Sequence, residues 1–184
     1  FEMRISRRVL LDLPQMREPA SGQVISLPAH GEPRVNRLLV RRGRLPEAGR
    51  ANEVAVNEDF AKAHAFRIGD SFSAILNGRK ERLQITGTVL SPEFIYTIGP
   101  GDMVPDPRRY AILYMPGDVL GPVFDRKEAF NNLVLRLMPG ASEPAVLMAV
   151  DRLLEPYGGM AAYGRKHQMS HAFLDAELDQ LAAM

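Results

Sequence analysis

Two histidines are the side chains best spaced for metal chemistry. His167 and His171 stand four residues apart in a stretch with helical periodicity, so both rings would share one helical face and could chelate zinc. The zinc-protease motif requires a glutamate directly after the first histidine, and Gln168 occupies that position. Because the sequence places no third ligand nearby, we interpret the two rings as solvated or interfacial, and we predict no metal and no cofactor.

Other reactive combinations are equally incomplete. Ser170 precedes His171, but no G-x-S-x-G nucleophile elbow surrounds it. The glycine-containing stretches "NGRK" at 77–80 and "GPGD" at 99–102 lack the eight-residue phosphate-binding pattern, so we interpret both as turns. Neighbouring acids have structural explanations in a helix start or a proline-rich loop. These acids are Glu58 with Asp59, and Asp102 with Asp106. We therefore predict that the chain is not an enzyme.

The composition of the chain argues against nucleic acid as a partner and against any chemistry that needs cysteine. The chain has 184 residues, 23 Lys and Arg against 22 Asp and Glu, and a net charge of +1. The basic residues are scattered among acids and carry no aromatic interleaving, so we predict no nucleic-acid binding. There is no cysteine, which excludes disulfides and thiolate metal sites. The chain begins with Phe1, and we expect it to be a segment of a longer protein whose membrane helices lie outside it.

The first two thirds of the chain alternate short strands with tight turns. Asn57 is predicted to cap a helix of about two turns, with Phe60, Ala61 and His64 on its inner face. Asn77-Gly78 is a strong hairpin signal, because both residues tolerate the positive φ of a type I′ turn. Gly87 predicts a bulge or bend in the return strand. We expect strands in 1–13, in "QVISLP" at 23–28, and at 35–41, 53–57, 71–76, 81–90 and 111–116, with 53–57 burying one face.

The last third is predicted to contain more helix. Ser142 is an N-cap followed by Glu143 and Pro144 in the first helical turn, and glycines 158 and 159 end this helix. Strands at 129–140 and 160–164 on either side of it would complete a split βαβ unit. An amphipathic helix is expected over 166–184, with an apolar stripe of Met169, Phe173, Leu174, Leu178 and Leu181.

Residues 41–70, "RRGRLPEAGRANEVAVNEDFAKAHAFRIGD", followed by "LQITGTVLSPEFIY", resemble the extracytoplasmic domain of FtsX/MacB-type ABC-transporter permeases. In that family a run of the type G-R-x-P, then E-V-x-V-N/S-E-x-F-A, then G-D recurs. Matching positions here are Gly43, Arg44, Pro46, Glu53, Val54, Val56, Asn57, Glu58, Phe60, Ala61, Gly69 and Asp70. The family usually has glycine where this chain has Ala65, so Ala65 either bears strain or the helix ends differently.

The resemblance implies an α+β fold, a porter-like subdomain with a split βαβ unit and a smaller β-rich one. On this pattern the N-terminal strand and connector of the porter-like subdomain cover residues 1–34, and the β-rich lobe covers 35–120. The βαβ unit covers 121–184 and ends in a helix that leads from Met184 toward a membrane helix. The resemblance also implies a place on the periplasmic or extracellular side of the cytoplasmic membrane. Its partner would be an ABC ATPase domain or subunit, which would hydrolyse ATP.

The same resemblance suggests export or extraction of a lipoprotein, lipid, peptide or drug, so the substrate or partner surface should be apolar. The long loop 91–110 is the candidate, because long loops in compact domains are commonly functional. We predict that Phe94, Tyr96, Met103 and Tyr110 form this surface. Two alternatives stay open: a free-standing binding or adaptor module, and a hydrolase with a site between the lobes.

Overall fold

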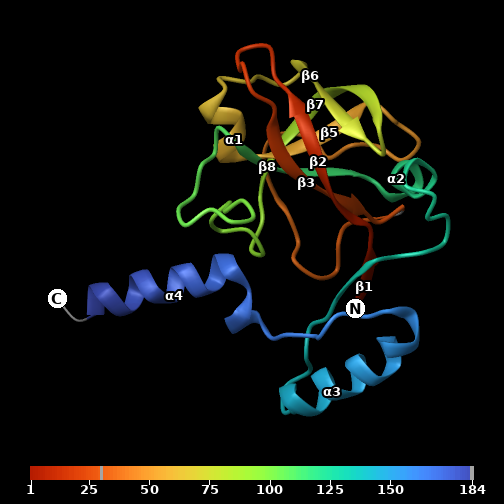
Figure 1. The fold of residues 1–184 in the computed structure, drawn as a ribbon, viewed down its shortest axis with the longest axis vertical. Helices are drawn as coiled ribbons and strands as arrows, with labels where there is room; N and C mark the ends of the chain where they lie inside the picture. The colour runs from red at the N-terminus through yellow and green to blue at the C-terminus, as the bar shows by residue number, and fades with distance from the viewer. Residues whose placement is uncertain (30, 183–184) are drawn as a thin grey trace.

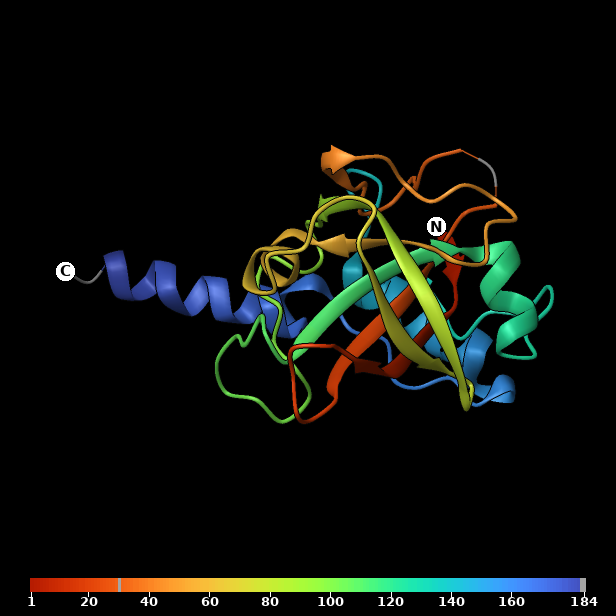
Figure 2. The same cartoon turned by 90° about the horizontal axis from the view of Figure 1, so that it is seen from above.

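A sheet that closes on itself forms the body of the protein. The computed structural model describes residues 1–29 and 31–182. Strands follow one another in the order β4-β7-β5-β8-β3-β2-β6, and β6 also pairs with β7, so six of the seven strands form a ring (Figures 1 and 2). Closure leaves β4 as the open edge. The strands are β2 (Ser6–Asp12), β3 (Ala20–Leu27), β4 (Leu39–Gly43), β5 (Glu53–Asn57), β6 (Ser71–Leu76), β7 (Arg79–Leu90) and β8 (Tyr110–Pro116).

Two local signals in the sequence shape this ring as expected. Asn77 and Gly78 have φ values of 48° and 80°, as a tight hairpin between β6 and β7 requires. The β5–β7 register shifts between Val54 and Ala55, whose partners are Ile85 and Gly87. A Cβ at Gly87 would lie 2.2 Å from the carbonyl oxygen of Arg44. The predicted hairpin and the predicted bulge are therefore both confirmed.

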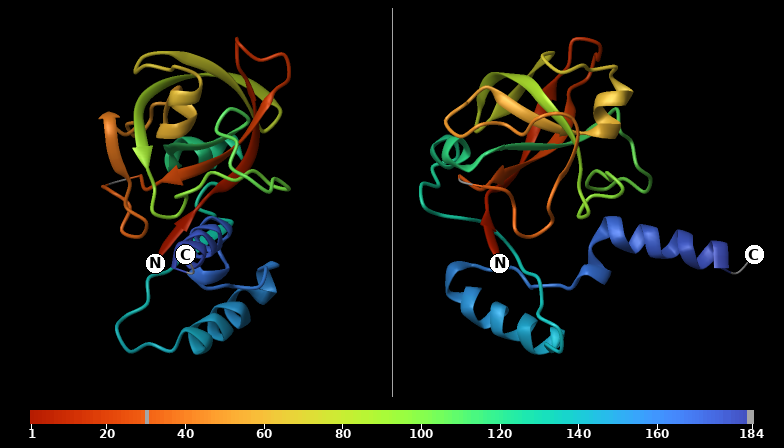
Figure 3. Two further views of the ribbon diagram at one scale, coloured as in Figure 1. Left: turned by 90° about the vertical axis from the view of Figure 1, so that its left-hand side faces the viewer. Right: turned by 180° about the vertical axis from the view of Figure 1, so that it is seen from behind.

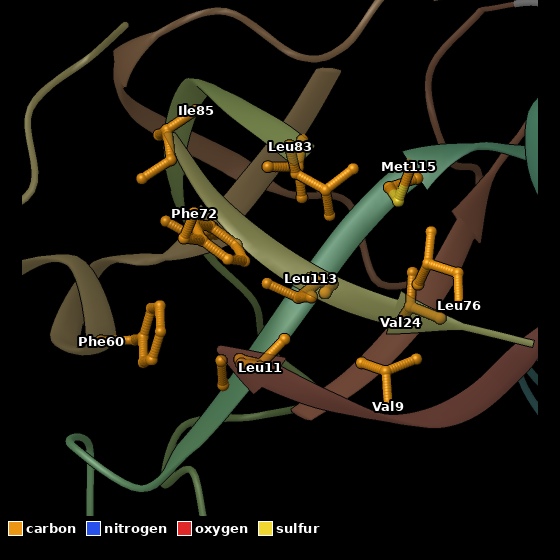
Figure 4. Packing of buried hydrophobic residues seen from close by; sticks show 14 of the residues in the cluster. Val9, Leu11, Val24, Phe60, Phe72, Leu76, Leu83, Ile85, Leu113 and Met115 are labelled. Carbon is orange, nitrogen blue, oxygen red and sulfur yellow. The ribbon is translucent and has the colours of Figure 1, made fainter. Parts of the chain in front are cut away.

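The interior of the ring holds the main hydrophobic core (Figure 4). Leu11, Leu83 and Leu113 converge there from three strands and are completely buried. Helix α1 (Glu58–Ala63) adds Phe60, and α2 (Gly117–Val123) adds Leu120. Phe60, Ala61 and His64 are all buried, which confirms the predicted inner face of α1.

A second cluster covers the outer face of the sheet. Its members include Ile25, Val89, Ile112 and Tyr114, against which the side chains of Leu38, Leu45 and Phe94 pack. Strand β5 lies between β7 and β8, so both of its faces are covered and all of its residues are buried. The prediction of a single buried face for 53–57 was therefore wrong, because a central strand under two packed layers needs no alternation.

Ala65 adopts a strained backbone conformation just after the end of α1. Its φ is 54°, in the left-handed region that favours glycine, while the Ala65 N–H still bonds to the Lys62 carbonyl at 3.1 Å. Of the two expectations for Ala65, the strained one is confirmed.

The remaining strands and helices lie below the closed sheet in the views of Figure 3. Strand β1 (Glu2–Arg4) pairs with β9 (Asn132–Val134) in a separate two-stranded sheet. The chain then forms α3 (Glu143–Leu154), two short 3₁₀ turns, η1 (Glu155–Tyr157) and η2 (Arg165–His167), and α4 (Met169–Ala182). Ser142 caps α3 as predicted, accepting a hydrogen bond from the Ala145 N–H at 3.4 Å. Within the described residues, no helix combines the length and the apolar character needed to cross a membrane.

Three predictions for strands need correction. Residues 160–164 form no strand, because the chain turns at Gly158 and the Ala162 N–H donates to the Asp151 carboxylate at 2.6 Å instead of to a sheet. The split βαβ unit is therefore not completed. The strand expected over 129–140 is limited to the three residues of β9, and the strand expected over 1–13 is broken at Ile5.

The division at residues 34 and 120 stays a prediction. Strand β3 pairs in parallel with β8 along Ser21–Leu27, so the hydrogen bonds of the closed sheet cross residue 34. Any subdomain boundary there would have to pass through a continuous ladder.

Candidate functional site

The four predicted surface residues are separated by the structure. Phe94 is half-buried against the outer cluster, and Tyr96 is half-buried against α4. Met103 is 90% exposed in the long loop. Tyr110 corrects our expectation, because it begins β8 and is only 4% exposed, with its hydroxyl donating to Gln23 at 3.2 Å. Burial raises the pKa of that phenol. Tyr110 is thus part of the core.

A groove of about 420 Å³ lies beside Phe94 on the outer face of the sheet. Its floor is apolar, with Val89 and Ile112 at the base and the exposed side chains of Leu39 and Leu90 at one edge. Leu39 and Leu90 are register partners, so they lie side by side. The volume is within the range of small-ligand sites. The remaining lining residues are Arg37, Asn57, Glu58, Asp59, Ser91, Pro92, Phe94, Ile95, Thr97 and Tyr114.

Asn57 holds the loop against this groove. Its side-chain amide donates to Thr97 Oγ1 at 3.1 Å, and its carbonyl oxygen accepts from the Ile112 N–H at 2.9 Å. Asn57 occupies the N-cap position of α1, as expected, but its side chain makes no capping hydrogen bond. The buried amide instead links β8 to the loop, which corrects the role predicted for this side chain.

Tyr96 attaches the same loop to α4. Its backbone N–H donates to Ser170 Oγ at 2.9 Å, and its hydroxyl donates to Glu177 Oε2 at 2.5 Å. The rings of Tyr96 and Phe173 meet edge to face with centroids 4.9 Å apart. The hydrogen bond to Glu177 raises the pKa of Tyr96, because it is made by the neutral phenol. Figure 1 shows the N-terminal end of α4 beneath this loop.

Glu93 joins the loop to both chain segments that lead away from the sheet. Its carboxylate accepts two hydrogen bonds from Arg4, at 2.7 and 2.9 Å, and one from Asn36 at 2.9 Å. Arg4 also donates to Asn132 Oδ1 on β9, at 2.6 and 3.0 Å. The backbone carbonyl of Glu93 accepts from Gln168 Nε2 at 2.7 Å, just before α4. We call Arg4, Glu93 and Asn132 the polar hub.

The histidine pair remains apart from this arrangement. His167 is exposed, while His171 lies 3.8 Å from Asp175 on the next turn of α4. Among residues 1–29 and 31–182, no group of three or more His, Cys, Asp or Glu side chains could hold a metal ion.

Sequence reasoning singled out Phe94 and Tyr96 but missed their partners. Arg4 is 89 residues away from Glu93 in the chain, and Ser170 and Glu177 are 74 and 81 residues away from Tyr96. No local pattern marks such pairs. The cluster of aromatic residues in a proline-rich loop was the one available signal, and the assignment of a substrate or partner surface to this loop stays a prediction.

Comparison with known proteins identifies the fold. No protein-family model matches the sequence, and no curated protein matches it. The extracellular domain of the noncanonic ABC-type transporter YknZ from Gram-positive bacteria is similar, with a TM-score of 0.51 and 13% identity over 87% of this chain and 76% of that one. The periplasmic region of MacB from Actinobacillus actinomycetemcomitans has a TM-score of 0.46 and 14% identity over 96% of this chain and 74% of that one. A domain of a putative permease protein from Porphyromonas gingivalis has a TM-score of 0.36 and 11% identity, with coverages of 84% and 70%.

The chain therefore has an α+β fold similar to that of the extracellular domain of the ABC-type transporter YknZ. The predicted α+β class and the resemblance recognised in residues 41–70 are confirmed at the level of the fold.

Proposed function

We propose that this chain is the extracytoplasmic domain of an ABC-transporter permease subunit, on the outer side of the cytoplasmic membrane. It couples ATP-driven motion of membrane helices to the export or extraction of a lipoprotein, lipid, peptide or drug. A separate ATPase domain or subunit hydrolyses the ATP. The likeness of the fold to a transporter domain supports the class of protein, and the contacts of loop 91–97 support the coupling.

The observation that carries the coupling is the two-sided loop. Phe94, Ile95 and Thr97 line the groove, whereas Glu93 and Tyr96 bond to the beginning of α4. Successive residues thus face different neighbours. Because residues 93–97 are hydrogen-bonded on both sides, a displacement of α4 is passed directly to one wall of the groove.

Helix α4 acts as the lever in this proposal. Its later turns carry the exposed side chains of Leu178 and Leu181, and it projects away from the sheet (Figure 3). Within the described residues, α4 is attached to the loop through Ser170, Phe173 and Glu177, and residues 178–182 beyond them are exposed. A rigid helix anchored at one end transmits motion as hinge and shear displacements do in other domains.

The groove, with Met103 exposed beyond it, is the proposed contact surface for substrate or partner. Phe94 and Ile95 offer apolar area next to the exposed Leu39 and Leu90. A contiguous exposed apolar surface of this kind is typical of an interaction site. Tyr110 is not included, because it is buried.

The test uses the full transporter. Tyr96→Ala should lower substrate export at least tenfold while ATP hydrolysis continues, because α4 loses its attachment to the loop. Phe94→Ala should also lower export, through the groove. Tyr157→Ala is the matched control, since Tyr157 is exposed on η1 and has no contact with the loop among the described hydrogen bonds and ring contacts. Export by Tyr96→Ala at the level of Tyr157→Ala would refute the coupling role.

The alternatives are separated by a simpler observation. Hydrophobic segments of about 20 residues encoded on both sides of this chain in its gene would support a permease. A free-standing module would have none, and a hydrolase would require activity that depends on a specific side chain between the lobes.

A further inference from the structure

A second cavity opens where strand β2 separates from β6. Strand β2 pairs with β3 over residues 6–11. It pairs with β6 only over residues 10–12. The edge of β2 over residues 7–9 therefore faces a cavity of about 520 Å³, with the hairpin tip at Asn77 and Gly78 on its other side. Because N–H groups alternate between the two edges of a strand, at least one N–H of residues 7–9 points toward this gap.

The cavity has an unusual charge distribution. Arg7 and Arg8 both line it, and no Asp or Glu does. Within the described residues, neither arginine is ion-paired, and Asp12, the nearest acid along β2, is bound by Lys80 at 2.5 Å. Arginine stays protonated at any physiological pH. The cavity therefore presents two positive charges without an internal counter-ion.

The guanidinium of Arg7 also has a donor without an acceptor. Its Nε is buried and makes no hydrogen bond within the described part of the chain. A buried donor on a charged group is costly when it has no acceptor. An external anion in the cavity would supply the acceptor that the protein does not.

Apolar side chains complete the lining. Val9 is buried, and Leu10, Ile75 and Phe124 lie along the cavity from β2, from β6 and from the end of α2. Leu10 is exposed on a strand whose inner face is already packed. These residues suit a hydrocarbon chain beside the charged group.

We propose that this cavity binds a small anionic amphiphile, with its carboxylate or phosphate at the open edge of β2, where Arg7 reaches it from the inner face and Arg8 from the outer face, and with its hydrocarbon tail on the register partners Leu10 and Ile75. Guanidinium groups bind both carboxylate and phosphate through paired N–H donors. The site lies between β2 and the β6–β7 hairpin and does not depend on the transporter assignment.

The experiment measures binding to the 184-residue chain by calorimetry. Octanoate and octyl phosphate should bind at least tenfold more tightly than inorganic phosphate or octanol, because the site recognises head and tail together. Arg8→Gln should weaken octyl phosphate binding at least fivefold. Arg82→Gln is the matched control, since Arg82 is also an exposed arginine on a strand and lies outside the cavity. Raising the salt concentration should weaken binding, as for any ion pair in contact with solvent.

Two further measurements locate the site and its natural ligand. Amide chemical shifts of Arg7–Leu10 and Gly78 should move on addition of octyl phosphate, while those of loop 91–97 stay unchanged. Sedimentation with phosphatidylglycerol vesicles, abolished by Arg8→Gln, would identify a lipid headgroup as the source of the anion. Binding of octyl phosphate without vesicle binding would identify a soluble amphiphile.

Three outcomes would overturn the proposal. They are no binding of either amphiphile, equal affinity for inorganic phosphate and octyl phosphate, and equal losses in Arg8→Gln and Arg82→Gln. Unchanged thermal unfolding of the Arg8→Gln variant would show that a loss of binding is not a loss of folding.

Discussion

The closed sheet and the C-terminal part of the chain are stabilised in different ways. Among the described residues, every buried apolar side chain lies between Ile5 and Leu120. Between residues 122 and 182 the one buried side chain is that of Ser170, and α3 buries none of its residues. The closed sheet thus has its own hydrophobic core, while the C-terminal part is attached to it by the polar hub and by the contacts of Tyr96.

This difference teaches how a domain can be both stable and movable. Burial of apolar area provides most of the free energy of folding, and it is concentrated in the ring. Elements held by a few hydrogen bonds belong to the low-stability end of a structure, where motion is expected. We therefore expect that the position of α4 can change without unfolding of the sheet.

The largest test breaks the core itself. Leu113→Ala should lower the free energy of unfolding by about 3 kcal/mol, because a fully buried leucine is replaced by a cavity. Leu153→Ala, at a leucine of α3 that is 71% exposed, should change it by less than about 0.5 kcal/mol. Urea denaturation measures both, and similar losses would contradict the contrast between the two regions.

The polar hub provides the next test. Glu93→Gln should cost about 2 kcal/mol, because a charged acceptor of several hydrogen bonds becomes neutral. Hydrogen exchange should accelerate in β1, β9 and the start of α4, and not in β8. Glu32→Gln removes a similar carboxylate from the exposed pair with Arg37 and should have almost no effect. Acceleration spread equally over the closed sheet would mean that the hub is not a local attachment.

The pH dependence of stability tests the ion pair between Glu53 and Arg44 in the closed sheet. The hydrogen bonds from Arg44 lower the pKa of Glu53 from 4.5 to about 2. Because the folded pKa is depressed, this carboxylate stabilises the fold above pH 4.5, and the contribution disappears as the pH falls toward 2. Glu53→Gln should therefore be less stable than wild type at pH 7, by less than Glu93→Gln, and the two unfolding curves should converge near pH 2. A constant difference across that range would disagree with this role.

The smallest expected effect is an increase in the free energy of unfolding. Ala65→Gly should raise the free energy of unfolding by about 0.5–1 kcal/mol, because glycine adopts the left-handed φ without the strain of a Cβ. Ala63→Gly, within α1, should lower it by a similar amount. Thermal unfolding measures both changes, and stabilisation by the second variant would argue against a conformational cause.

Much of the closed sheet could be predicted because its signals are local. The strand 53–57, the Asn77-Gly78 turn, the bulge at Gly87 and the cap at Ser142 all depend on backbone preferences of single residues or pairs. The strand expected over 160–164 failed because its apolar residues found no neighbouring strand, and a strand exists only when its hydrogen bonds are paired.

The candidate site was predictable only in part. Aromatic residues in a long proline-rich loop pointed to Phe94 and Tyr96, but nothing local separated them from Tyr110, which the parallel pairing of β8 with β3 buries. The partners Arg4, Asn132, Ser170 and Glu177 come from distant segments that only chain folding brings together.

Residue types and their order alone set the Asn77-Gly78 turn, the cap at Ser142, the α+β class and the exclusion of thiol chemistry, because these depend on local conformation and on which functional groups are present. Tertiary structure decided that the sheet closes, that loop 91–97 contacts both a groove and α4, and that two arginines line a cavity without a carboxylate. Those features are contacts between residues far apart in the chain, and their free energy exists only when the whole fold has formed.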